Sequence, residues 1–270
     1  MIETMQHSAP IAACGANIDE RSRPPFVAAG GTDRGRVRAR NEDAALMRPE
    51  LGLFVVADGV SGATGNEGGG FAAQLAVDNI ARVIRAADPE ALRPVAADML
   101  RRAVQVADRC ISEEGKAAGF PGMGTTVAAL LVAGADALVA HVGDSRVYRL
   151  RQGKLERLTV DHTLLAQWEA AHQRPGPPEV RARAGHILTR ALGGRRPGID
   201  VDVRAVAWEP GDVFLLCSDG LHGLVSDDDM AEVIMGAPDL DRAVVRLLRR
   251  ANEAAGHDNI TAVLVRMLGD

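Results

Sequence analysis

The sequence predicts an α+β protein in which a β-sandwich core is covered by α-helices. Residues 125–158 consist of short apolar runs separated by turn residues, which is typical of an antiparallel meander. Long segments with helical periodicity lie between the strand-like runs, without the strict strand-helix alternation of a doubly wound parallel sheet. The chain has 270 residues, a length at which a single domain is common.

The N-terminal part is predicted to be a leader that precedes the fold. Residues 1–24 combine small and polar residues without periodicity, and the leader is followed by a proline at position 25. We therefore expect a flexible leader over residues 1–24 and a single folded domain over residues 25–270.

The first elements of the domain are a buried strand and two helices. An apolar run at residues 51–57, bounded by glycines, predicts the strand. Apolar residues at helical spacing then predict two amphipathic helices. These residues are Phe71, Leu75, Ile80 and Val83 in the first helix, and Leu92, Val95, Met99, Ala103 and Val106 in the second.

The second half of the chain begins with the meander, whose strands we expect at residues 127–133, 138–142, 147–150 and 155–158. Residues 161–185 contain several prolines among charged residues and show no clean period, so we expect an irregular excursion outside the core. A buried strand at residues 213–217, a helix at residues 240–251 and a closing strand at residues 260–265 complete the prediction.

The composition excludes several classes of protein. Hydrophobic residues make up 47% of the chain and charged residues 25%, which excludes a largely disordered protein. The net charge of −5 and an aromatic content of 3% argue against nucleic-acid binding. The longest apolar run, residues 127–135, is too short to span a membrane. Three cysteines without metal-binding spacing fit the reducing cytoplasm.

Four aspartates stand at or near the ends of predicted strands. Asp58 and Asp219 each follow an apolar run and precede a glycine, Asp258 precedes the closing strand, and Asp144 lies between two meander strands. Each could simply form a turn, because Asp and Gly are common turn residues. Four such aspartates together favour a cation site, because gathered carboxylates repel each other unless cations neutralise them. Oxygen ligands of this kind suit Mg²⁺ or Mn²⁺ better than zinc.

Further candidate ligands lie upstream. Glu42 and Asp43 offer more carboxylates, and Gly59 has no side chain, so that its backbone can approach an ion closely. Three arginines, at positions 36, 38 and 40, precede them. They could form a solvated charged face. One arginine beside a carboxylate cluster would also make a phosphate clamp, because a guanidinium group matches two phosphate oxygens.

These motifs together resemble the metal-dependent protein phosphatase family, type 2C, in its bacterial form. The similarity covers residues 32 to 265 and rests on eight segments in a fixed order. They are Thr32-Asp33-Arg34-Gly35, Val37-Arg38 with Asn41-Glu42-Asp43, Ala57-Asp58-Gly59-Val60, Gly122-Met123-Gly124-Thr125-Thr126, Val142-Gly143-Asp144-Ser145-Arg146, Leu188-Thr189-Arg190-Ala191-Leu192-Gly193, Ser218-Asp219-Gly220-Leu221 and Gly256-His257-Asp258-Asn259-Ile260-Thr261.

The resemblance implies a four-layer fold, in which two antiparallel sheets pack face to face with helices on both outer sides. It also implies two Mn²⁺ or Mg²⁺ ions, with Asp58 bridging them and the Gly59 carbonyl binding one. Asp219 and Asp258 would hold the other ion. The resemblance also implies supporting roles. Glu42 would bind an ion through water, Asp43 would support the cluster, and Arg38 would bind phosphate and take part in catalysis. Asp144 and Asp219 would hold a third, weaker ion, and residues 161–185 would form a mobile flap.

The implied activity is hydrolysis of phosphoserine and phosphothreonine in proteins by a water that two metal ions activate. Such an enzyme would act against a serine/threonine kinase, and we expect a cytoplasmic monomer that binds neither nucleic acid nor membrane. Two alternatives remain: a catalytically idle regulatory or phosphoprotein-binding domain of the same fold, and a phosphatase of small phosphate esters. One departure is that residues 60–63 contain no histidine where many members have one, so no histidine general acid can be assigned there.

Overall fold

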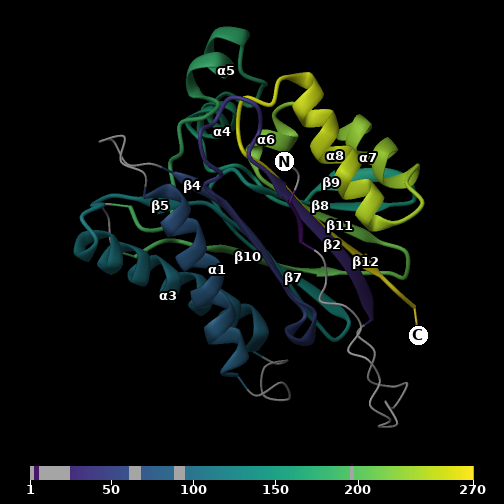
Figure 1. Ribbon diagram of the computed structural model, residues 1–270, viewed down its shortest axis with the longest axis horizontal. Helices are drawn as coiled ribbons and strands as arrows, with labels where there is room; N and C mark the ends of the chain where they lie inside the picture. The colour runs from purple at the N-terminus through teal and green to yellow at the C-terminus, as the bar shows by residue number, and fades with distance from the viewer. Residues whose placement is uncertain (1–2, 6–24, 61–67, 88–94, 195–197, 270) are drawn as a thin grey trace.

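A computed structural model describes residues 3–5, 25–60, 68–87, 95–194 and 198–269 of the chain. Two six-stranded sheets form its centre, and every strand pair in them is antiparallel. The sheets run side by side through the middle of the molecule, with helices on both outer sides (Figure 1). The predicted α-β-β-α layering is therefore confirmed.

The first sheet joins the N-terminal and C-terminal strands of the fold. Its central strand β12 pairs with β2 on one side and with β11 on the other. In the order of the sheet, the strands are β1 (Glu3–Met5), β2 (Phe26–Asp33), β12 (Ile260–Met267), β11 (Val213–Cys217), β8 (Arg146–Arg151) and β9 (Lys154–Arg157).

The second sheet is built around β4 and the meander. In order, its strands are β10 (Asp202–Ala207), β7 (Asp136–Val142), β6 (Val127–Ala133), β4 (Leu53–Val60) and β3 (Asp43–Arg48), and β5 (Gly124–Thr125) pairs with the end of β4. A short 3-10 helix, η2 (Pro49–Leu51), connects β3 to β4.

The helices divide between the two outer layers and the top of the molecule. The helices α1 (Gly69–Arg85) and α3 (Ala96–Ala117) cover the second sheet, whereas α7 (Asp227–Met235) and α8 (Leu240–Ala254) cover the first. The short α6 (Asp219–His222) follows β11 directly. In the described part of the chain, no helix combines the length and the apolar character that a membrane span requires.

Three hydrophobic clusters explain why the central strands are apolar on both faces. In β4, Leu53 and Val55 pack against α1 and α3, while Phe54 and Val56 face the other sheet. Between the sheets, the ring of Phe54 meets that of Phe26 edge-on at a centroid distance of 5.3 Å. A strand buried on both sides has no polar face, which is why it reads as one apolar run.

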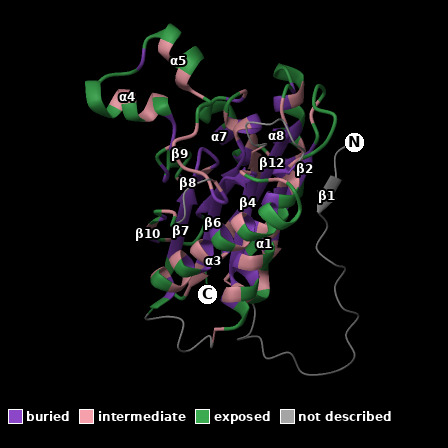
Figure 2. Cartoon of the chain, turned by 90° about the vertical axis from the view of Figure 1, so that its left-hand side faces the viewer, coloured by how far each residue is buried: buried purple, intermediate pink, exposed green. Residues whose placement is uncertain are grey.

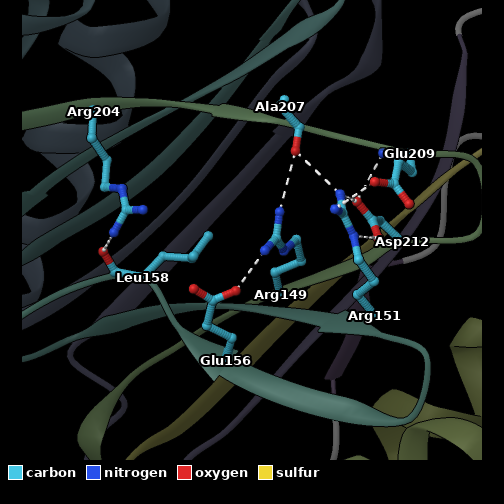
Figure 3. A network of polar contacts seen from close by, with 8 residues as sticks. All are labelled: Arg149, Arg151, Glu156, Leu158, Arg204, Ala207, Glu209 and Asp212. Carbon is cyan, nitrogen blue, oxygen red and sulfur yellow. Dashed lines mark hydrogen bonds and ion pairs between the residues drawn. The ribbon is translucent and has the colours of Figure 1, made fainter.

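Polar side chains tie the two sheets together at one edge (Figure 3). Arg149 and Arg151 of β8, in the first sheet, both donate hydrogen bonds to the carbonyl of Ala207 at the end of β10, in the second sheet. Arg151 also forms a bidentate ion pair with Asp212, at N to O distances of 2.8 and 2.6 Å. The Asp212 side chain is 2% exposed, so this ion pair lies at the margin of the core.

The segment at residues 161–185 differs in one respect from the prediction. It contains two short helices, α4 (Leu164–His172) and α5 (Pro178–Ala184), in place of irregular chain. Thr163 caps α4 by accepting a hydrogen bond from the Ala166 amide, and Pro178 stands at the start of α5, where a missing N–H costs nothing. Neither helix contributes a buried residue, and both project from the body of the protein (Figure 2).

Some strands and helices were not anticipated. The strands β2, β3 and β10 and the helices α6 and α7 lack a long apolar run, because small or charged residues interrupt them. Within the predicted leader, residues 3–5 form β1 and pair with β2. The rest of the leader, and Leu92 of the second predicted helix, lie outside the described residues.

Candidate active site

The predicted carboxylates gather at one end of the two sheets. Asp43 opens β3 and is the register partner of Asp58 near the end of β4. Asp219 opens α6 directly after β11, and Asp258 lies just before β12. Asp144 stands in the turn between β7 and β8. The same charge cluster therefore draws residues from strand ends of both sheets.

Hydrogen bonds hold part of the cluster rigidly and leave two oxygens open. The Oδ2 atom of Asp43 accepts hydrogen bonds from the hydroxyls of Ser218, at 2.8 Å, and Thr261, at 2.6 Å. Its Oδ1 atom and the Oδ1 atom of Asp219 are buried without a hydrogen-bond partner among the described residues. Buried carboxylate oxygens without partners are costly. Their oxygen-rich surroundings fit a hard divalent cation.

The raised pKa values of the aspartates show that the carboxylates are buried close together with little positive charge nearby. Burial, followed by the charges of its neighbours, raises the pKa of Asp58 well above its ordinary value. Burial likewise raises the pKa of Asp43 and that of Asp144 to about 7, and it raises the pKa of Asp219 with help from the charge of Asp258. Such shifts mark carboxylates whose charged form a bound cation would stabilise.

Gly59 allows three segments to meet beside the cluster. A Cβ atom at this position would lie 2.4 Å from the carbonyl oxygen of Gly69 and 2.6 Å from that of Glu42. No side chain fits there, and β4, the start of α1 and the Glu42 segment therefore approach one another closely. The Glu42 side chain lies at the start of α1, because a Cβ atom on Gly69 would be 3.2 Å from its Oε1 atom.

Arg38 provides positive charge at the rim of the cluster. Its Nη2 atom lies 2.7 Å from Oδ2 of Asp258, and half of its side chain is exposed. Burial lowers the pKa of Arg38, but the charge and hydrogen bond of Asp258 outweigh this, with smaller contributions from Asp58 and Asp219, and the pKa rises. Arg38 therefore stays cationic, and its exposed guanidinium group is open to an anion from solvent.

Asn259 holds the loop that carries Arg38, a role that the sequence analysis did not assign. Its Nδ2 atom donates to the carbonyls of Arg34 and Arg40, both at 2.9 Å, and its Oδ1 atom accepts from the Glu42 amide at 2.8 Å. One side chain, 5% exposed, thus satisfies three backbone groups of the loop. The signal was its place beside Asp258 in the last motif.

A second group of polar residues lies beyond Asp144. His141, His162 and Asp202 each offer a ligand atom, and these atoms lie within 4.8 Å of one another. The Nδ1 atom of His162 accepts a hydrogen bond from the Gly143 amide, which places the ring proton on Nε2, opposite Asp202 at 3.1 Å. The guanidinium group of Arg190 also contacts Asp202, at 2.9 Å. These contacts occupy the polar atoms of His162 and Asp202, whereas both ring nitrogens of His141 are buried without a hydrogen-bond partner among the described residues.

The structure thus brings together all of the predicted site residues, at positions 38, 42, 43, 58, 59, 144, 219 and 258. Residues 61–63, which include no histidine, lie outside the described part of the chain. His222, which was not singled out, lies near the cluster and contacts the Asp144 carbonyl at 2.9 Å. Burial lowers the pKa of His222 to about 3, so it is a neutral hydrogen-bonding group.

Known proteins are similar to this chain in both sequence and architecture. The chain is 32% identical over 242 residues to the serine/threonine phosphatase Stp of Listeria monocytogenes, covering 87% of this chain and 93% of that protein. It is similar to the catalytic domain of the phosphatase PstP, solved with two manganese ions, at 31% identity and a TM-score of 0.77, covering 90% and 99%.

A phosphatase of Mycobacterium smegmatis, MsPP, solved in complex with cacodylate, is 36% identical with a TM-score of 0.75, and the match covers 90% of this chain and 98% of that one. The profile of the protein phosphatase 2C family matches residues 31–268, which include every residue of the carboxylate cluster. The chain belongs to the protein phosphatase 2C family.

Proposed function

We propose that this protein hydrolyses phosphoserine and phosphothreonine in other proteins with the help of bound divalent cations. The observation that carries the proposal is the buried carboxylate cluster, with two unpartnered oxygens, beside a cationic arginine. Its relatives are named serine/threonine phosphatases, and one of them holds two manganese ions.

The residues divide into ligands and supports. Asp58 would bridge two ions, Mn²⁺ or Mg²⁺, the carbonyl of Gly59 would contact one of them, and Asp219 and Asp258 would hold the other. When bound, the ions lower the pKa of water and neutralise charge on the phosphoryl group. Asp43, held by two hydroxyls, would keep the cluster in register.

Three finer roles complete the proposed site. Glu42, whose side chain lies beside the start of α1, would bind a metal ion through water. Asp144, whose raised pKa reports the nearby charge of Asp219 after burial, would hold a third and weaker ion with Asp219. Arg38 would bind the phosphate with its exposed guanidinium group, because it can exchange its contact with Asp258 for phosphate oxygens.

The organisation of the protein follows as part of the same proposal. Residues 25–270 would form a single catalytic domain behind a leader at residues 1–24, and residues 161–185 would be a flap, since α4 and α5 project without buried residues. We also propose a monomer that opposes a serine/threonine kinase and does not bind nucleic acid or membrane. A cytoplasmic location is supported by the free thiols of Cys110 and Cys217.

A metal-reconstitution experiment tests the function. The chelated protein should be inactive and should regain turnover of phosphoserine and phosphothreonine peptides with Mn²⁺ or Mg²⁺. Turnover of a small aryl phosphate alone would favour a phosphatase of small esters, and binding of phosphopeptides without turnover would favour an idle domain. Full activity after thorough chelation would contradict the proposed site.

A further inference from the structure

The two ends of the segment that carries α4 and α5 meet at His162. The Thr189 amide donates a hydrogen bond to the His162 carbonyl at 2.8 Å, and the Leu164 amide donates to the Ile187 carbonyl at 2.9 Å. Between them, Thr163 and Leu188 form an antiparallel bridge. Residues 162–164 and 187–189 therefore close the projecting segment at its base.

His162 also holds the turn that precedes Asp144. Its amide donates to the Gly143 carbonyl at 2.7 Å, and the Gly143 amide donates to its Nδ1 atom at 3.1 Å. Gly143 has a φ of 102°, and a Cβ atom there would lie 2.6 Å from Thr126, so this turn requires glycine. His162 thus binds both polar backbone groups of Gly143.

The ring of His162 is oriented from its other side. Its Nε2 atom lies 3.1 Å from Oδ2 of Asp202 on β10, and Arg190, which follows the base of the segment, donates to Oδ1 of the same carboxylate at 2.9 Å. The ring of His141 packs against it at a centroid distance of 4.6 Å. His162 is 8% exposed, and its rotamer is therefore set by contacts on every side.

We propose that His162 is a positioning residue that couples the base of the α4–α5 segment to the turn that carries Asp144. This inference rests on the proposed function, in which Asp144 serves the catalytic site. The coupling is reciprocal: whatever orders the Asp144 turn also stabilises the base of the segment, and the reverse holds equally. His162 itself touches none of the proposed ligands, and it acts through Gly143.

Two substitutions test the two hydrogen bonds of the His162 ring separately. In His162→Asn, the amide oxygen lies two bonds from Cβ, as Nδ1 does, and can accept the Gly143 amide. In His162→Gln, the amide nitrogen reaches the Nε2 position and can donate to Asp202, but no acceptor faces Gly143. His186→Gln is the matched control, because His186 is exposed on the same segment and contacts only the Ala182 carbonyl.

Trypsin cleavage of the metal-free protein at the exposed arginines of the segment, at positions 181 and 183, reports on its base. We expect His162→Gln to be cleaved about fivefold to tenfold faster, the effect of one lost buried hydrogen bond. His162→Asn and the control should stay within about twofold of the wild type. Titration calorimetry with Mn²⁺ should show several binding steps, of which the weakest is the one proposed for Asp144. We expect the affinity of this step to fall by a similar factor in His162→Gln alone.

Equal behaviour of the Asn and Gln variants would overturn the coupling, since both remove the imidazole ring but only one removes the acceptor. A His162→Gln protein with wild-type cleavage and Mn²⁺ binding would overturn it as well. A wild-type protein without phosphopeptide turnover would refute the proposed function separately, and the cleavage comparison would remain readable in that case.

Discussion

At the scale of single residues, Asp58 lies among the charges of Asp43, Asp219, Asp144 and Asp258. Asp58→Asn keeps the shape of the side chain and removes one charge from this crowded cluster. We expect turnover of a phosphothreonine peptide to fall below detection, while circular dichroism and the melting temperature without metal stay at least at wild-type levels. Near-normal turnover would mean that the cation ligands lie elsewhere.

The raised pKa of Asp144 gives a pH dependence with a definite sign. The folded, metal-free protein keeps this proton up to about pH 7, whereas an unfolded chain releases it near pH 4. Stability from this group is therefore complete below pH 4 and is lost as the pH rises to about 7.

Asp144→Asn cannot lose that proton, so without metal it should become progressively more stable than the wild type between pH 4 and pH 7, with a constant difference above. Melting curves of both proteins in chelator measure this difference directly. The buried histidines titrate in both proteins and cancel. A difference that is flat across this range, or that shrinks with pH, would show that Asp144 does not titrate as described.

At the scale of elements, Asn259 anchors the loop between β2 and β3 on which Arg38 stands. Asn259→Asp preserves size but replaces the Nδ2 donor with an acceptor facing the carbonyls of Arg34 and Arg40. We expect kcat/KM for a phosphopeptide to fall about tenfold or more, mostly through KM, as in Arg38→Ala, because a charged hydrogen bond contributes about 1.5–3 kcal/mol.

A double-mutant cycle decides whether Asn259 acts through Arg38. Once Arg38 is alanine, Asn259→Asp should reduce kcat/KM by less than about twofold further, because its effect depends on the missing guanidinium group. Independent, multiplying losses would instead assign Asn259 to general stability of the loop.

Whether an element or a contact could be predicted from the sequence depends on which side chains it buries. The strands β4, β6, β11 and β12 were predicted because both of their faces are buried, and the site aspartates because they end or precede such strands. The contacts of Asn259 to the loop and of His162 to Gly143 join residues up to 225 positions apart. Their partners are mostly backbone groups, which carry no residue-specific signal in a single sequence.

At the scale of the whole molecule, the edge network predicts where the sandwich is vulnerable. Arg151→Ala leaves the carboxylate of Asp212, which is 2% exposed, without its ion pair. We expect the free energy of unfolding to fall by about 2 kcal/mol, because an unpaired buried charge is costly. Urea denaturation measures this loss.

Arg101→Ala is the control for this substitution. Its ion pair with Asp98 is largely exposed, within one helix, and should contribute less than about 0.5 kcal/mol. Equal losses in the two variants would mean that the ion pair of Arg151 with the buried Asp212 adds no more stability than an exposed ion pair.

The carboxylates stand at the ends of strands, several of which are buried on both faces, and this placement has a dynamic consequence. Amide hydrogens of β4, β11 and β12 should exchange with solvent only on global opening, whereas those of α4 and α5, which bury no residue, should exchange through local fraying. Deuterium uptake would then divide the protein into a slow scaffold that carries the ligands and a fast rim. Such a rim is free to move without disturbing the geometry of the carboxylates.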